Sequence, residues 1–199
     1  MNKKIAILGA GGHGKVVGEI ALMNKYKVIN FFDDKKKEIN KFPFSIKGTQ
    51  DQLEKNLNYY DEFFVAIGDN KIRHNKFTWL KKLKLNIVNL VHPNSSVSKF
   101  SSLGKGICIM SNAVVNPGSK INDGVILNSS SSIDHDCIIK EYAHISPNCS
   151  LSGNVSVGKF THLGTGTSVH PGIKIGNNVK TGIGSKIYKD ILDNEIFRN

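Results

Sequence analysis

The C-terminal half of the chain carries an aliphatic residue at almost every sixth position, from Val97 to Ile187, and Thr181 breaks the series. Six residues turn an α-helix by roughly 600°, so a helix would not gather these side chains on one face. A period of six is typical of a parallel β-helix, in which such side chains fill the axis of a triangular prism. The aliphatic column consists of Val97, Leu103, Ile109, Val115, Ile121, Leu127, Ile133, Ile139, Ile145, Leu151, Val157, Leu163, Val169, Ile175 and Ile187.

Two further columns keep the same period. Small or β-branched residues stand two positions before the aliphatic column, among them Ala113, Ser119, Cys137, Ala143 and Thr161. Gly or Asn often follows directly after it, as at Gly104, Asn116, Asn122, Asn128, Gly158, Gly164, Gly176 and Gly182. We expect this Gly/Asn column to take unusual backbone angles at the corners of the prism. Residues 93–199 are therefore predicted to form a β-helix, in which residues 18 apart stack, as at His144 and His162.

The first ninety residues follow a different pattern, in which short aliphatic runs alternate with segments of helical spacing. The strands expected are Lys4–Leu8, Lys27–Phe32, Phe63–Ile67 and Ile87–Val91, with one helix after Gly14 and another over Lys71–Lys84. Such alternation predicts a parallel sheet with helical crossovers. We assign residues 1–92 to this α/β domain, a half-Rossmann unit.

A glycine-rich turn follows the first strand. Gly9, Gly11 and Gly14 fit the G-x-G-x-x-G pattern, which lets a phosphate approach a helix N-terminus. Asp33 and Asp34 lie about 20 residues on, where an acid can bind a ribose hydroxyl. The alternative is a purely structural tight turn. Since the helical pattern stops after Val91, only half of a dinucleotide fold is present, which suits a mononucleotide portion better than a dehydrogenase.

Charge and composition limit the classes of ligand and partner that the chain is expected to bind. The chain carries a formal net charge of +11, which favours phosphate-rich ligands, but Arg73 and Arg198 are its only arginines. Scattered lysines without arginine forks or interleaved aromatics do not predict a nucleic-acid reader. No apolar run is long enough to span a membrane, and the opening MNKKIAILGAGG is predicted to be a strand and not a signal peptide. Three cysteines without a CxxC pair indicate a reducing cytoplasm.

His135 is the candidate catalytic residue. It lies two positions after Ile133, in a corner column that holds proline in other coils, so its side chain should point outward. Asp134 and Asp136 flank it, and a flanking carboxylate can orient an imidazole that acts as a general base. The alternative is a solvated turn histidine with two acids nearby.

Four segments carry a resemblance to a known family: the opening GAGGHG, the Asp33-Asp34 pair, AIGDN with IR following, and VILNSSSSIDHDC leading into the repeat. Over its whole length the chain resembles the bacterial sialic acid O-acetyltransferase family, and within it the nucleotide-linked amino-sugar N-acetyltransferases of the bacillosamine type. The resemblance implies a left-handed coil and a homotrimer with active sites between subunits. It also implies transfer of an acetyl group from acetyl-CoA to the amine of a nucleotide-linked, UDP-type 4-amino-4,6-dideoxy sugar, with no metal.

The resemblance assigns roles to individual residues. His135 would be the base, Asp136 its orienting acid, although relatives have a glutamate there, and Asn128 would contact the acceptor amine. Acetyl-CoA would meet His144, Thr165 and Ile183. The nucleotide of the acceptor would lie against Gly11, Gly12, His13, Asp33, Asp34 and Gly68.

The chain departs from the family pattern at one place, and three functions other than sugar N-acetylation stay open. Relatives continue into a G-x-P-A-K turn where this chain ends at Asn199, so we expect the coenzyme contacts of that turn to be made differently or weakened. The alternatives are O-acetylation of a sialic acid, a non-catalytic trimeric scaffold, and a zinc hydratase of the γ-carbonic anhydrase kind. A zinc site needs three converging histidines. The chain lacks the close histidine pair of those enzymes.

Overall fold

The computed structural model describes residues 3–35 and 43–198, and the chain folds as two units, Met1–Leu90 and Val91–Asn199. The first unit is built on a parallel sheet of order β3-β2-β1-β4. Its strands are β1 (Lys4–Leu8), β2 (Val28–Phe32), β3 (Ile46–Gly48) and β4 (Glu62–Val65). Its helices are α1 (Gly12–Met23), α2 (Gln50–Glu54), the 3-10 helix η1 (Leu57–Tyr59) and α3 (Asn70–Lys82).

The sheet is buried through continuous apolar runs, as a parallel sheet requires. Ile5, Ala6 and Ile7 of β1 are fully buried, and α1 contacts β1 and β2 while α3 contacts β4. The strand predicted at Lys4–Leu8 is confirmed in both of its bounds. The elements β3, α2 and η1 were not predicted, because their short segments show no clear periodicity.

The strand predicted at Ile87–Val91 is wrong as a member of this sheet. Ile87 forms only an isolated bridge to Phe63, and Leu90–Val91 instead forms β5, the first strand of a seven-stranded sheet in the repeat region. The physical reason lies in the aliphatic column, because Val91 stands six residues before Val97 and already follows the period of the coil.

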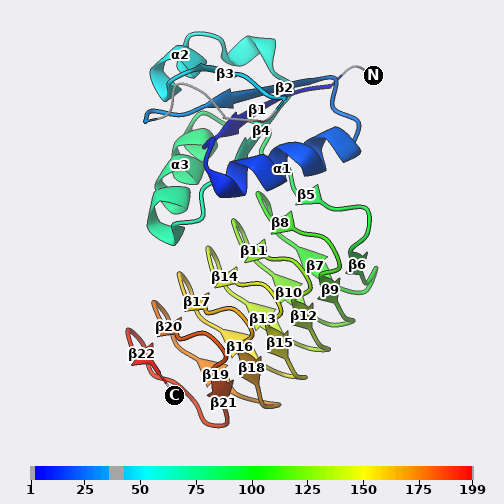
Figure 1. Ribbon diagram of the computed structural model, residues 1–199, viewed down its shortest axis with the longest axis vertical. Coiled ribbons are helices and arrows are strands. Elements are labelled where there is room, and N and C mark those ends of the chain that lie inside the picture. The colour runs from blue at the N-terminus through cyan, green and yellow to red at the C-terminus, as the bar shows by residue number, and fades with distance from the viewer. Residues whose placement is uncertain (1–2, 36–42, 199) are drawn as a thin grey trace. The chain divides into compact units, whose positions relative to one another are not determined.

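The second unit is the predicted parallel β-helix, with two-residue strands stacked into three sheets (Figure 1). The seven-stranded sheet contains β5 (Leu90–Val91), β8 (Cys108–Ile109), β11 (Ile126–Leu127), β14 (His144–Ile145), β17 (His162–Leu163), β20 (Lys180–Thr181) and β22 (Ile196–Phe197). The six-stranded sheet contains β6 (Ser96–Val97), β9 (Val114–Val115), β12 (Ser132–Ile133), β15 (Ser150–Leu151), β18 (Ser168–Val169) and β21 (Lys186–Ile187). The five-stranded sheet contains β7 (Ser102–Leu103), β10 (Lys120–Ile121), β13 (Ile138–Ile139), β16 (Ser156–Val157) and β19 (Lys174–Ile175).

Neighbouring strands pair with a register of 18 residues, so the predicted stacking is confirmed. Ile126 pairs with His144, and His144 pairs with His162. The last coil is two residues shorter, since Lys180 pairs with Ile196. The aliphatic column fills the core, with Ile133, Ile139 and Ile145 fully buried, and each such side chain contributes roughly 1.5–3 kcal/mol.

The Gly/Asn column does not take the unusual backbone angles predicted for it. The left-handed residues of the corners lie two positions later, at Asn112, Ser130, Asp136, Tyr142, Asn148, Asn154, Phe160 and Asn178 and at several glycines. The Gly/Asn column instead permits close stacking of successive coils. A Cβ on Gly158 would lie 2.3 Å from the carbonyl oxygen of Gly176, a distance that no side chain can tolerate.

Candidate functional site

A pocket of about 380 Å³ opens at the carboxyl ends of β1, β2 and β4 in the first unit. This is the edge at which parallel α/β sheets bind ligands, next to the point where the strand order reverses. All six residues predicted to contact the nucleotide lie in its wall: Gly11, Gly12, His13, Asp33, Asp34 and Gly68. The structure also adds wall residues that the sequence did not single out, including Lys35, Gln50, Ile72 and Lys76.

The glycines of the turn divide into two groups. Gly9 has a φ of +103°, and a Cβ on Gly14 would lie 2.4 Å from the Gly9 carbonyl oxygen, so these two allow the turn to pack against α1. A Cβ on Gly11, Gly12 or Gly68 would meet nothing within 4 Å. These three glycines therefore leave open space in the pocket. The α1 N-terminus has no side-chain cap and no acid in its first turn, which leaves its N–H groups for an anion.

The two aspartates are already engaged by the protein. Asp33 accepts hydrogen bonds from the backbone N–H groups of Ala10 at 2.8 Å and Lys35 at 2.9 Å, so it ties the turn after β1 to the end of β2. Asp34 accepts from the Gln50 N–H and from Lys76 Nζ, and these partners lower its pKa. Both carboxylates fix the pocket wall, and the ribose contact predicted for them stays a prediction.

His13 is a neutral imidazole in this wall. Burial, and then the nearby Arg73 guanidinium, lower its pKa to about 4. Its Nε2 is buried and has no hydrogen-bond partner among the described residues. Arg73 is itself buried and donates to the carbonyl oxygens of Ile67 and Gly68, which fixes the loop on the far side of the pocket. A buried nitrogen in a pocket wall is a position at which a ligand can form a hydrogen bond.

In the second unit, His135 lies on an outward corner between β12 and β13, as predicted. We call residues 134–136 the His135 corner. His135 Nδ1 lies 2.8 Å from Asp136 Oδ2, and both side chains are more than half exposed, at 55% and 58%. The hydrogen bond that Asp136 accepts from the imidazole, and then the charge of Asp134, raise the pKa of His135 above its ordinary value. Because Asp136 engages Nδ1, the second ring nitrogen, Nε2, is available to accept a proton.

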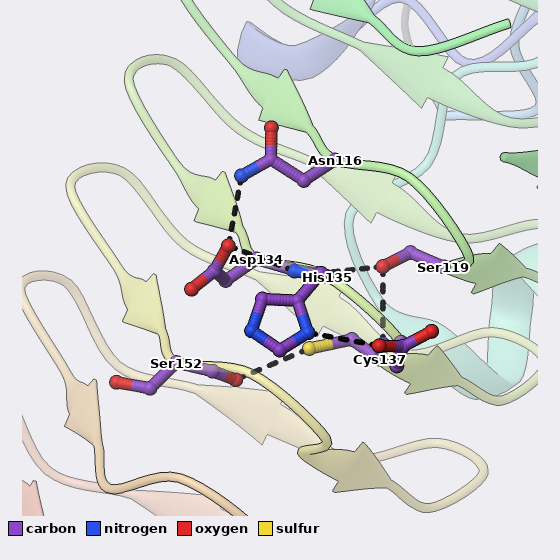
Figure 2. A network of polar contacts seen from close by, with 7 residues as sticks. Asn116, Ser119, Asp134, His135, Cys137 and Ser152 are labelled. Carbon is purple, nitrogen blue, oxygen red and sulfur yellow. Dashed lines mark hydrogen bonds and ion pairs between the residues drawn. The ribbon is translucent and has the colours of Figure 1, made fainter. Parts of the chain in front are cut away.

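The preceding coil holds this corner from one side (Figure 2). Asn116 Nδ2 donates to Asp134 Oδ1 at 2.9 Å. The fully buried Ser119 Oγ donates to the Asp134 carbonyl at 2.6 Å and accepts from the Cys137 N–H at 3.0 Å. One hydroxyl therefore holds the backbone at residues 134 and 137, on both sides of the turn. Neither Asn116 nor Ser119 was predicted, because their role depends on the 18-residue stacking.

Two glycines in neighbouring coils make room for the His135–Asp136 pair. A Cβ on Gly153, one coil after His135, would lie 2.5 Å from both Cε1 and Nε2 of the imidazole. A Cβ on Gly118, one coil before Asp136, would lie 2.2 Å from Asp136 Oδ1. The imidazole and the carboxylate thus occupy spaces that any side chain larger than glycine would fill. A search for glycine 18 residues before and after the His135 corner would have found both.

Asn128 does not meet His135. Its Nδ2 lies 3.2 Å from His144 Nε2, and it follows β11 of the seven-stranded sheet, whereas His135 follows β12 of the six-stranded sheet. His144 and His162 stack with ring centroids 4.5 Å apart, and His162 Nε2 lies 3.0 Å from Ser146 Oγ. Asn128 and His144 therefore form a second polar cluster on another edge of the prism.

Thr165 and Ile183 follow β17 and β20 of the same seven-stranded sheet and stack on each other, with the Gly184 N–H donating to the Thr165 carbonyl. Thr165 is exposed, and Ile183 is 85% exposed. All three predicted acetyl-CoA residues, His144, Thr165 and Ile183, thus line one edge together with Asn128. The structure separates this edge from the His135–Asp136 pair within a single copy of the chain.

Three further findings concern the part of the chain that the structure describes. It contains no helix long and apolar enough to cross a membrane. No group of three His, Cys, Asp or Glu side chains within it could hold a metal ion. The three cysteines, all among the described residues, are buried and form no disulfide with one another.

Comparisons with known proteins agree with this architecture. The family model described as the PglD N-terminal domain matches residues 4–80. The UDP-N-acetylbacillosamine N-acetyltransferase of Bacillus subtilis (strain 168) is 34% identical over 112 residues, 55% of this chain and 52% of that protein. The chain thus matches about half the length of this curated relative.

Solved structures match over nearly the whole chain. The acetyltransferase domain of PglB from Neisseria gonorrhoeae FA1090, in complex with acetyl coenzyme A, has a TM-score of 0.92 at 38% identity, covering 98% of this chain and 95% of that one. PerB from Caulobacter crescentus, in complex with CoA and GDP-perosamine, has a TM-score of 0.90 at 32% identity, covering 97% and 92%. The chain has the same half-Rossmann unit and left-handed parallel β-helix, and it belongs to the hexapeptide-repeat sugar N-acetyltransferase family that carries the PglD N-terminal domain.

Proposed function

We propose that this protein transfers an acetyl group from acetyl-CoA to the amine of a nucleotide-linked 4-amino-4,6-dideoxy sugar, with His135 as the general base. The observation that carries the proposal is the 2.8 Å contact between His135 Nδ1 and Asp136 on an exposed corner. The relatives named above support the donor and the acceptor class, since their names include UDP-N-acetylbacillosamine, GDP-perosamine and acetyl coenzyme A.

The chemistry requires one proton acceptor. The lone pair of the amine attacks the thioester carbonyl carbon of acetyl-CoA, which forms the C–N bond and places negative charge on the carbonyl oxygen. His135 Nε2 takes a proton from the attacking nitrogen. The intermediate then collapses, the C–S bond breaks, and the leaving sulfur is protonated from His135 to give free CoA. The products are the N-acetylated sugar and the CoA thiol, and His135 returns to its neutral form.

Asp136 contributes to two parts of this cycle. Its hydrogen bond holds the tautomer in which Nδ1 carries the hydrogen and Nε2 is basic. It also raises the pKa of His135 above the ordinary 6.5, which makes the imidazole a stronger base and stabilises the imidazolium after proton transfer. The side chain of His13, whose pKa is lowered to about 4, is neutral at the same pH and serves binding only.

The pocket of the first unit suits the nucleotide part of the acceptor. It combines an uncapped helix N-terminus with Lys35 and Lys76, which favours a diphosphate, and three glycines that leave room for it. Gly11, Gly12, His13, Asp33, Asp34 and Gly68 are the residues that we propose to contact it.

We further propose a homotrimer with the active sites between subunits. His135 and Asp136 lie on one edge of the prism, whereas Asn128, His144, Thr165 and Ile183 lie on another, so a neighbouring copy can supply the second set. Mixing His135→Ala with His144→Ala protomers tests this arrangement. Activity should return to roughly a quarter of the sites if subunits exchange at random, and no recovery would contradict shared sites.

Acetyl-CoA and nucleotide sugars are cytoplasmic metabolites, so we assign the protein to the cytoplasm.

The proposed activity is tested by release of the CoA thiol from acetyl-CoA in the presence of a panel of acceptors. The panel contains UDP- and GDP-linked 4-amino-4,6-dideoxy sugars and free sialic acid, and mass spectrometry identifies the acetylated product. Release with a nucleotide-linked amine is expected. Release with sialic acid alone would transfer the assignment to O-acetylation, and no release with any acceptor would favour a non-catalytic scaffold.

A further inference from the structure

Asp134 is the member of the His135 corner that the proposed chemistry leaves without a role. Its Oδ1 accepts two hydrogen bonds, from the His135 N–H at 2.8 Å and from Asn116 Nδ2 at 2.9 Å. These donors lower the pKa of Asp134, so the carboxylate is ionised at neutral pH. No described residue donates to its second oxygen, Oδ2. A fixed, ionised carboxylate thus presents one unoccupied acceptor directly beside the base.

The orientation of this oxygen suits a role toward the acceptor. In Figure 2 the unoccupied oxygen of Asp134 and the ring nitrogen of His135 that bears no dashed contact lie on the same side of the corner. Asp136 binds the opposite ring nitrogen, Nδ1, at 2.8 Å. The two flanking acids therefore serve different sides of the imidazole. Asp136 contacts Nδ1, the nitrogen that needs orienting. The unoccupied oxygen of Asp134 lies on the side of Nε2, the nitrogen that receives the proton (Figure 2).

The acceptor amine creates a need for such a group. A sugar amine is partly protonated at neutral pH, and a carboxylate binds an ammonium through a charge-assisted hydrogen bond. A hydroxyl at the same carbon carries no charge and gains far less from this contact. A site that keeps an ionised carboxylate next to its base thereby distinguishes an amine from a hydroxyl.

We propose that Asp134 is a specificity-determining residue, whose Oδ2 binds the ammonium of the acceptor sugar beside His135 Nε2 and selects an amine over a hydroxyl. The inference rests on the proposed acetyl transfer. In this step the bound ammonium loses one proton, which leaves the site to solvent, before the neutral amine attacks. Asp134 binds the cation and does not itself exchange the proton. Asn116 is then a positioning residue, since it holds the carboxylate by Oδ1.

Asp134→Asn is the test variant, because asparagine keeps an oxygen for the His135 N–H and replaces the charge with an amide. Calorimetry measures the Kd of the nucleotide-linked 4-amino sugar chosen by the acceptor panel and of its 4-hydroxy counterpart. The wild-type protein should bind the amine more tightly. In Asp134→Asn the Kd of the amine should rise by about 10- to 100-fold, the equivalent of one charge-assisted hydrogen bond, and that of the hydroxyl analogue should change by less than about twofold.

Asp136→Asn is the matched control, because it removes the other acid of the same corner. It should lower turnover and leave the preference for the amine in binding unchanged. Asp134→Glu retains the charge and should restore part of the preference. An equal rise in the Kd of both sugars in Asp134→Asn, or an unchanged preference, would overturn the inference. A wild-type protein that binds neither sugar would instead contradict the proposed function.

Discussion

At two corners of the β-helix, a buried hydroxyl forms hydrogen bonds to the backbone on both sides of the turn. We call this arrangement the brace. At the His135 corner, Ser119 Oγ donates to the carbonyl of residue 134 at 2.6 Å and accepts from the N–H of residue 137 at 3.0 Å. Thr161 does the same at residues 176–178, which we call the Asn177 corner. Its Oγ1 donates to the Gly176 carbonyl at 2.6 Å and accepts from the Val179 N–H at 3.1 Å.

The backbones of the two corners agree further. Asp136 has a φ of 60° and Asn178 a φ of 56°, at the same position of the turn. The side chains differ, since one corner presents an imidazole between two acids and the other presents two asparagine amides. The brace is therefore a property of the coil, and the chemistry depends on which side chains stand on it. If scaffold and chemistry are separate, a change at the His135 corner should affect turnover, and the matching change at the Asn177 corner should not.

The largest effect is expected from His135→Ala. Removal of a positioned base should lower kcat by about 10²–10⁴, because that is the factor a positioned general base contributes to proton transfer. Asn177→Ala, at the matching position of the other corner, should change kcat by less than about twofold. Steady-state rates of thiol release measure both. Comparable losses in the two variants would show that the effect comes from damage to the coil.

The next effect is expected from Gly153→Ala. The three atoms nearest to the new methyl group would all belong to the His135 ring, the first at 2.5 Å, so the half-exposed ring should turn away and kcat/KM should fall by about 10²-fold. Gly182→Ala is the control, since its Cβ would meet only ordinary contacts at 3.7 Å and beyond. Thermal melting should show similar Tm values for both. Full activity in Gly153→Ala would mean that the ring position is not critical.

A smaller change in rate, with a shift in pH dependence, is expected from Asp136→Asn. The wild-type base is active only when neutral, so kcat/KM should fall as the pH drops through a His135 pKa that lies above 6.5. Without the carboxylate this pKa should return toward 6.5, which moves the acid limb to lower pH, and the plateau should fall by about tenfold because the base is weaker. The measurement is the pH profile of kcat/KM. An acid limb at the same pH in both proteins would assign it to another group.

The smallest effect is expected from the brace itself. Ser119→Ala and Thr161→Val each leave a part-buried carbonyl and a buried N–H without their hydroxyl partner, so each should lower the free energy of unfolding by about 1–3 kcal/mol. Only Ser119→Ala should also reduce turnover, by a few-fold, because it loosens the His135 corner. Urea unfolding and thiol release measure the two effects. A loss of turnover in Thr161→Val would show that the corners are not independent.

Much of the site could be predicted from the sequence because the six-residue period converts sequence distance into position. The stack of His144 on His162 and the outward place of His135 follow from that arithmetic alone. The aliphatic column is interrupted at Thr181, and this interruption lies close to the coil that is two residues shorter. The six residues of the first-unit pocket were predicted by the strand-turn-helix pattern and the family resemblance, and they do line one cavity.

The sequence by itself determined the coil, its register and the residue types on its corners, because the same six-residue pattern of aliphatic, small and turn-forming residues is repeated in every coil. Only the tertiary structure decided which groups hold one another. Asn116, Gly118, Ser119 and Gly153 act on the His135 corner through contacts between coils, and Asn128 turned out to meet His144 and not His135. The physical reason is that hydrogen bonds and steric exclusion operate over a few ångströms in space, and residue spacing along a chain fixes such distances only where the backbone repeats.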